Sequence, residues 1–377
     1  MKIGFDDFQR YSMKTDVKKR SRDVGVEIAR IIGCLIVIGC HTCLPISEDM
    51  DFCFSRTFVA MCCADGVAVF WLILGFFLFQ HNQDYGKLCK KMCRHIILPL
   101  FFMSVFTFYF YPFTKGATSI GECINRPLTE YVSAIKATIV WTPIIGAGHL
   151  WYLYVYALVI LAFPALKGVV IQADTDRKRF GFVLIMLLLF GINVFEENNL
   201  LHCSHYSIGG LVPASIIAII GHFLYEFKPN LTKVGYIAIL VYAIINIART
   251  FVYKLGFSYI IWWYTASGVL CASCLMCFSF RLSRLVHNNL IEASICRIAS
   301  LTFPVYLIHK LVIGVLERYK ITDWALGLFK DASNVAADFF YPLLMTVIVF
   351  LISLVFAFSI RLLQSCIRSM FSRRNWG

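Results

Sequence analysis

Three ionisable residues stand in the first long apolar run of the sequence: Glu27, Arg30 and His41. Ionisable side chains are costly inside a membrane, so residues of this kind are functional candidates. Glu27 and Arg30 are three residues apart, so they are neighbours on one face of a helix and can pair. Arg30 and His41 are eleven residues apart. In an α-helix this spacing places them on the same face, about 16 Å apart along the axis.

These residue types suit a path from an anionic donor to a hydroxyl acceptor. A guanidinium binds phosphate or carboxylate groups, and an imidazole can take a proton from a hydroxyl. With the amino terminus inside the cell, Arg30 lies near the cytoplasmic entry and His41 lies deeper. Structural alternatives remain open: Arg30 reaches the lipid headgroups, Glu27 only neutralises Arg30, and His41 is part of a polar helix end.

The elements that must hold these residues are membrane helices. Of the 377 residues, 59% are hydrophobic and only 15% are charged, whereas soluble domains carry roughly 25% charged residues. A membrane-spanning helix needs about 20 mostly apolar residues. Runs of this kind predict an all-α bundle with about ten spans. The predicted spans are 26–45, 58–79, 95–113, 149–171, 180–195, 208–226, 234–251, 260–280, 298–316 and 341–364. The apolar stretch 131–146 is interrupted and is interpreted as a re-entrant or interfacial segment.

The charges between the runs predict the topology. The net charge is +13, and basic clusters occupy every second loop, as in Lys90, Lys91 and Arg94. The intervening loops carry acidic residues such as Glu196 and Glu197. By the positive-inside rule, this alternation predicts an even number of spans with both termini in the cytoplasm. We therefore expect membrane lipids, and no nucleic acid, to bind the basic residues.

The predicted topology divides the chain into three segments. We expect a basic cytoplasmic segment over 1–25, a membrane domain over 26–364 and a basic cytoplasmic tail over 365–377. The first residues contain no apolar stretch of the signal-peptide type, so no cleaved signal is predicted. Cys271, Cys274 and Cys277 lie inside an apolar run, where cysteine behaves as a small apolar residue. No metal site is therefore predicted.

Five stretches of the sequence resemble the acyltransferase-3 family. The segment from Glu27 to Arg30, followed by His41, is similar to the family's Arg-x10-His signature. Residues 66–76 resemble its "VPLFFVLSGF" stretch, with Leu74 where serine is usual. The other three follow in the family's order. They are the basic loop 90–94 running into Pro99, the "GHLWFL…P"-like residues 148–153 followed by Pro164, and the "S…S…YLIH"-like residues 300–309.

The resemblance implies an acyl-coenzyme A-dependent membrane O-acyltransferase of the bacterial inner membrane. Its donor is a cytoplasmic acyl-coenzyme A, most often acetyl-coenzyme A, and no permanently bound cofactor is expected. Its acceptor is a polysaccharide or lipid-linked sugar. The oligomeric state is left open.

The resemblance also implies roles for individual residues. His41 acts as the general base or relays the acyl group, Glu27 orients Arg30, and Arg30 and Arg94 meet the phosphates of coenzyme A. His149, Trp151 and His309 face the acceptor. Structural alternatives are a topology charge at Arg94, a structural role for the two later histidines, and an interfacial belt for the aromatic residues 262–264.

Two other classes of protein compete with the enzyme. A transporter or flippase for a polysaccharide intermediate also explains the spans and the charges inside them, but not the five ordered stretches. A sensor or regulatory membrane protein normally carries a soluble output domain, and no segment of this sequence predicts one. Dependence of the activity on the acyl thioester distinguishes the enzyme from the transporter.

Overall fold

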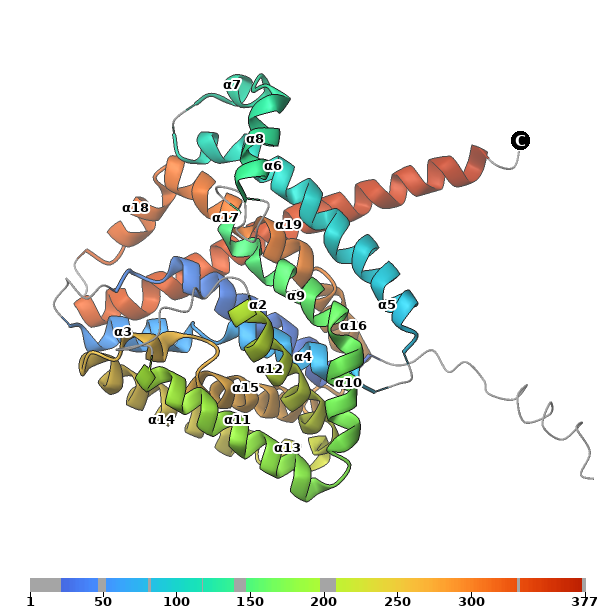
Figure 1. The fold of residues 1–377 in the computed structure, drawn as a ribbon. Coiled ribbons are helices and arrows are strands. Elements are labelled where there is room, and N and C mark those ends of the chain that lie inside the picture. The colour runs from blue at the N-terminus through green and yellow to red at the C-terminus, as the bar shows by residue number, and fades with distance from the viewer. Residues whose placement is uncertain are drawn as a thin grey trace, which may run out of the picture.

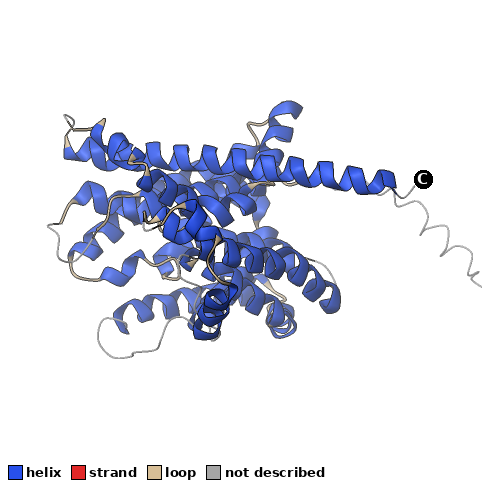
Figure 2. Cartoon of the chain, turned by 90° about the horizontal axis from the view of Figure 1, so that it is seen from above, coloured by secondary structure: helices blue, strands red, loops and turns tan. Residues whose placement is uncertain are grey.

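The computed structural model describes residues 22–46, 52–80, 83–116, 118–138, 147–196, 208–330 and 333–374. Every regular element in these ranges is a helix, which confirms the all-α class (Figure 1; Figure 2). The longer helices are α2 (Val24–Thr42), α4 (Gly66–Leu78), α6 (Leu98–Thr114), α8 (Leu128–Thr138), α9 (Trp151–Leu161), α10 (Phe163–Gln172), α11 (Asp176–Glu196), α12 (Ile208–Glu226), α14 (Gly235–Lys254), α15 (Ala266–Ser283), α16 (Asn289–Ala299), α17 (Thr302–Arg318) and α19 (Asn334–Arg374). The shorter elements are α3 (Phe54–Cys62), α5 (Tyr85–Met92), η1 (Cys93–Ile97), α7 (Ile120–Ile124), η2 (Gly148–Leu150), α13 (Lys228–Lys233), η3 (Ser258–Ile261) and α18 (Ile321–Gly327).

Several described helices are suited to a membrane. Six helical segments of the described ranges are long and apolar enough to cross it, and eight if two bent pairs each form one span. The bent pairs are η2–α9 with α10, at 64°, and α16 with α17, at 54°. The apolar part of α12 is shorter, and part of α11 adjoins undescribed residues. The chain is thus a multi-pass membrane protein, and the number of ten spans stays a prediction.

The helices differ from the apolar runs mainly at breaks and ends. The second predicted span consists of α3 and α4, separated by a short break. The third corresponds to the end of η1 and to α6, where η1 is one turn of π-helix that continues from α5. The last helix, α19, continues to Arg374 and extends away from the rest of the bundle (Figure 1). Of the stretch 131–146, the first part belongs to α8, and the remainder lies outside the described residues.

Helix α2 has a central place in the bundle. It packs against α3, α4, α15, α16, α17 and α19 (Figure 1). Asp23 begins the helix, because its side chain accepts a hydrogen bond from the Gly25 amide at 3.1 Å and so caps the helix. A Cβ added at Gly66 would lie 2.7 Å from the Gly33 carbonyl oxygen, so α4 approaches α2 closely only because these residues are small. Residues on α2 therefore project among several other helices.

Helices α4 and α12 also approach each other closely at glycine residues. A Cβ at Gly75 would collide with the Ala218 carbonyl, and one at Gly221 would collide with the Leu72 carbonyl. The large side chains around this contact, Trp71, Leu72 and Phe76 among them, are almost completely buried. This packing fixes α4 against the bundle and holds Trp71 inside it.

Candidate active site

Three histidines from distant parts of the sequence meet inside the bundle. His41 lies in the last turn of α2, His149 in η2 and His309 in α17. The rings of His41 and His309 are stacked with their centroids 5.3 Å apart, and His149 meets His309 edge-on at 5.1 Å. We call these residues the histidine cluster. All were predicted site residues, and the structure brings them together.

Backbone carbonyls fix the orientation of two of the rings. His309 Nδ1 lies 2.6 Å from the Tyr306 carbonyl oxygen, and His149 Nε2 lies 3.2 Å from the Leu307 carbonyl oxygen. A carbonyl only accepts, so these nitrogens must carry the protons and donate. In the neutral rings the opposite nitrogens, Nε2 of His309 and Nδ1 of His149, then hold lone pairs. Both are buried without a hydrogen-bond partner among the described residues.

The surroundings hold these rings in place. His309 is completely buried, and His149 is 7% exposed. The Tyr306 hydroxyl donates a hydrogen bond to the His149 carbonyl, which ties α17 to η2. Leu150 and Leu153 belong to the apolar packing around Tyr306. His41 differs, because it is only half-buried and makes no hydrogen bond with a described residue.

Glu27 and Arg30 form the ion pair that their spacing allows. Arg30 Nη1 lies 3.1 Å from Glu27 Oε2, and Arg22 Nε lies 3.7 Å from Glu27 Oε1. The Glu27 side chain is 5% exposed and that of Arg30 is 27% exposed. Arg30 also lies over the ring of Phe77, with Cζ 5.7 Å from the centroid. Arg30 thus stays accessible on the central helix, while Glu27 is buried beneath it.

Five aromatic residues form a group beside the histidine cluster: Trp71, Trp151, Tyr152, Tyr156 and Trp263. Trp71 contacts Tyr152 with a centroid distance of 4.3 Å and contacts both Tyr156 and Trp263 at 6.4 Å. Trp151 stacks on Trp263 at 5.6 Å. We call these residues the aromatic cluster.

The aromatic cluster lies near both the histidine cluster and the Glu27–Arg30 pair. Tyr152 lies 5.8 Å from Tyr306, which contacts the histidine cluster. At the other side, Tyr152 and Tyr156 lie within electrostatic range of Arg30. The aromatic cluster therefore contacts Tyr306 directly and lies near Arg30.

The model of one protein family, described as an acyltransferase domain, matches residues 23–362 and so covers nearly the whole chain. The chain belongs to the acyltransferase-3 family. No curated protein and no solved structure matches it. Together with the apolar helices, the family makes this chain a multi-pass membrane acyltransferase.

Two further predicted positions lie on different elements of this acyltransferase. Arg94 is exposed on η1 and makes no ion pair with a residue that the structure describes. Trp263 is only 7% exposed and stacks inside the bundle. It therefore does not fit an interfacial belt, whereas Trp262, at 43% exposed, does.

Asp65 and Arg249 are charged residues that the sequence analysis missed. Arg249 Nη1 lies 2.7 Å from Asp65 Oδ2, and both side chains are at most 1% exposed. The guanidinium also donates to the carbonyls of Ile260, at 3.0 and 3.1 Å, and Ile261, at 3.1 Å. Both residues lie inside predicted spans, so the rule that selected Glu27 and Arg30 would have selected them too.

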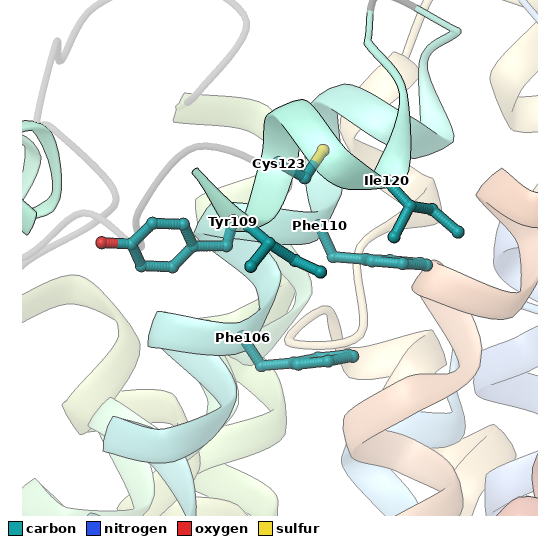
Figure 3. A pocket seen from close by; sticks show the side chains of 6 residues that line it. Phe106, Tyr109, Phe110, Ile120 and Cys123 are labelled. Carbon is teal, nitrogen blue, oxygen red and sulfur yellow. The ribbon is translucent and has the colours of Figure 1, made fainter. Parts of the chain in front are cut away.

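A separate pocket of about 420 Å³ lies between α6 and α7 (Figure 3). It is lined by Phe106, Tyr109, Phe110, Ile120, Cys123 and Ile124. None of the predicted site residues is among them. The lining offers neither a base nor a cation, so this pocket is not the candidate active site.

Proposed function

We propose that this acyltransferase moves an acyl group, acetyl in the first instance, from cytoplasmic acyl-coenzyme A to a hydroxyl of a cell-surface polysaccharide or lipid-linked sugar. A bacterial inner membrane is the setting that has both substrates. The observation that supports the proposal is the histidine cluster, which places proton acceptors beside the central helix of a membrane acyltransferase.

His41 is the general base in this proposal. Its ring is half-buried and has no hydrogen bond to a described residue, so it is available to a substrate. It takes the proton of the acceptor hydroxyl as the oxygen forms a bond to the thioester carbonyl carbon. The carbon–sulfur bond then breaks, and the leaving thiolate takes that proton. The products are an ester and free coenzyme A, so the step needs no bound cofactor.

Arg30 meets the donor in this proposal. Coenzyme A is rich in phosphates, and a guanidinium is suited to phosphate because it donates in a planar fork. Arg30 is accessible, and Glu27 fixes its position through the 3.1 Å contact. Arg94, exposed on η1 just before the third predicted span, is a second cation for the same anion. Trp151 supplies a ring face on which an acceptor sugar can stack.

The experiment measures acyl transfer in isolated membranes. Membranes from a strain that lacks the gene, complemented with wild type or variant, receive radiolabelled acetyl-coenzyme A, and label in the glycan fraction is counted. His41→Ala is expected to lower the rate at least about 100-fold, as for loss of a general base. His287→Ala removes an exposed histidine between α15 and α16 and is the matched control.

The same experiment can refute the proposal. Full transfer by His41→Ala at equal protein abundance would remove His41 from the mechanism. No transfer of label by the wild type would refute acetyl transfer itself. Appearance of the glycan at the cell surface without any thioester requirement would instead favour the transporter.

A further inference from the structure

Lys310 is a lysine inside the predicted span 298–316, and no described residue forms a hydrogen bond or ion pair with it. It lies on α17 and is half-buried. The carboxylate whose charge reaches it, Glu317, pairs instead with Lys115 at 3.4 Å. An unpaired ammonium at such a position costs free energy, so it is a functional candidate.

Lys310 lies at the histidine cluster. It directly follows His309 in the chain, and it lies within electrostatic range of His41, His149 and His309. It also lies within electrostatic range of Cys40, the residue before His41, whose side chain is exposed although α2 packs against six other helices. Consecutive residues of an α-helix are about 100° apart around the axis. His309 is completely buried and Lys310 is half-buried, so Lys310 lies on a more accessible side of α17 than its neighbour.

The histidine cluster itself has no free hydrogen-bond donor for the oxyanion that acyl transfer forms. An acyl-transfer step develops negative charge on the carbonyl oxygen, and enzymes stabilise it with donors aimed at that oxygen. The N–H groups of the neutral His149 and His309 rings already donate to backbone carbonyls. His41 is needed as a base. The ammonium of Lys310 has three donors and no described acceptor.

We infer that Lys310 is a catalytic residue that donates a hydrogen bond to the acyl carbonyl oxygen as this becomes an oxyanion. The inference rests on the proposed function. As the acceptor oxygen bonds to the carbonyl carbon, the π electrons move to the carbonyl oxygen beside the ammonium. When the carbonyl re-forms, the carbon–sulfur bond breaks and the thiolate takes the proton that His41 removed. Lys310 keeps all its protons throughout.

The test compares three variants in the membrane assay with radiolabelled acetyl-coenzyme A. Lys310→Met removes the charge at similar length and is expected to lower kcat about 100-fold, the effect of losing an oxyanion donor. KM for acetyl-coenzyme A should stay within about twofold, since the contact forms only in the transition state. Lys310→Arg, which keeps the charge, should retain most of kcat. Lys254→Met is the matched control, because Lys254 is an exposed lysine at the end of α14.

Two results would contradict the role of Lys310. An unchanged kcat in Lys310→Met overturns it. So does a raised KM for acetyl-coenzyme A with unchanged kcat, which would assign Lys310 to an anion bound in the ground state, such as a phosphate. If size-exclusion chromatography shows Lys310→Met misfolded, Lys310→Gln is measured in its place. Absence of label transfer by the wild type refutes the proposed function, whereas an active wild type with an equally active Lys310→Met refutes only the role of Lys310.

Discussion

At the scale of single residues, the three histidines differ in what their rings can do. In His149 and His309, one ring nitrogen donates a hydrogen bond to a backbone carbonyl. The other nitrogen of each neutral ring therefore carries the lone pair. His41 is held by ring stacking on His309 and keeps both nitrogens available. Under the proposed function, this difference favours His41 as the base that meets the substrate. His149 and His309 would then orient His41 or pass on its proton.

The lone pair of His309 can be removed without removing its hydrogen bond. In His309→Asn the side-chain amide can still donate to the Tyr306 carbonyl, but it has no basic nitrogen. We expect this variant to remain folded and to transfer acetyl about 100-fold more slowly than wild type. Label transfer in membranes and a melting curve in detergent measure the two effects.

His309→Ala is the companion variant, because it loses the donor as well as the base. It should be less stable than His309→Asn and no more active. If His309→Asn transfers acetyl at the wild-type rate, Nε2 has no part in the reaction and the ring is structural.

At the scale of elements, the Asp65–Arg249 pair joins three parts of the chain. Asp65 begins α4, Arg249 lies in α14, and the guanidinium binds the carbonyls at the end of η3. Trp263 is the second residue after η3 and stacks on Trp151. The buried pair therefore fixes the loop that completes the aromatic cluster.

Removing one partner of this ion pair should lower the stability of the protein. Arg249→Met leaves Asp65 buried and uncompensated, and removal of one partner from a buried ion pair destabilises by about 3–5 kcal/mol. We expect a clearly lower melting temperature in detergent. The double variant Arg249→Met with Asp65→Leu should partly recover the wild-type melting temperature.

Lys178→Met is the control for this measurement. Lys178 pairs with Asp174 at 2.8 Å, but both side chains are more than half exposed. Exposed pairs contribute roughly 0–1 kcal/mol, so the melting temperature should barely change. Equal effects of Arg249→Met and Lys178→Met would show that the buried pair does not fix the loop.

At the scale of the whole molecule, the proposed function depends on the position of α2. Its packing against six other helices places Arg30 and His41, about three turns apart, on the same central element. Donor and acceptor can then approach one line of residues from opposite ends of the bundle. This arrangement requires the amino terminus of α2 to lie at the cytoplasmic side.

The charge pattern predicts that both termini lie in the cytoplasm. An epitope at either terminus should be hidden from antibody in intact spheroplasts and become accessible after permeabilisation. An epitope inserted after Glu48, in a predicted outer segment, should be accessible without permeabilisation and is the control. Accessibility of a single terminus in intact cells would mean an odd number of spans.

The local features of this protein followed from its sequence. The helices coincide with the apolar runs, because lipid requires every backbone polar group to be satisfied within the helix. The Glu27–Arg30 pair followed from helix geometry, since residues three apart share a face. The breaks between α3 and α4 and at η1 were not predicted, because hydrophobicity is continuous across them.

The sequence by itself determined the membrane helices, the family resemblance and the individual candidates Glu27, Arg30, His41, His149 and His309. Only the tertiary structure decided that residues 41, 149 and 309 form one cluster. It also decided that Trp263 turns inward and that Asp65 meets Arg249. The physical reason is that these contacts join helices far apart in the chain. Such packing depends on small-residue contacts like that at Gly66 and on buried hydrogen bonds, which no local pattern encodes.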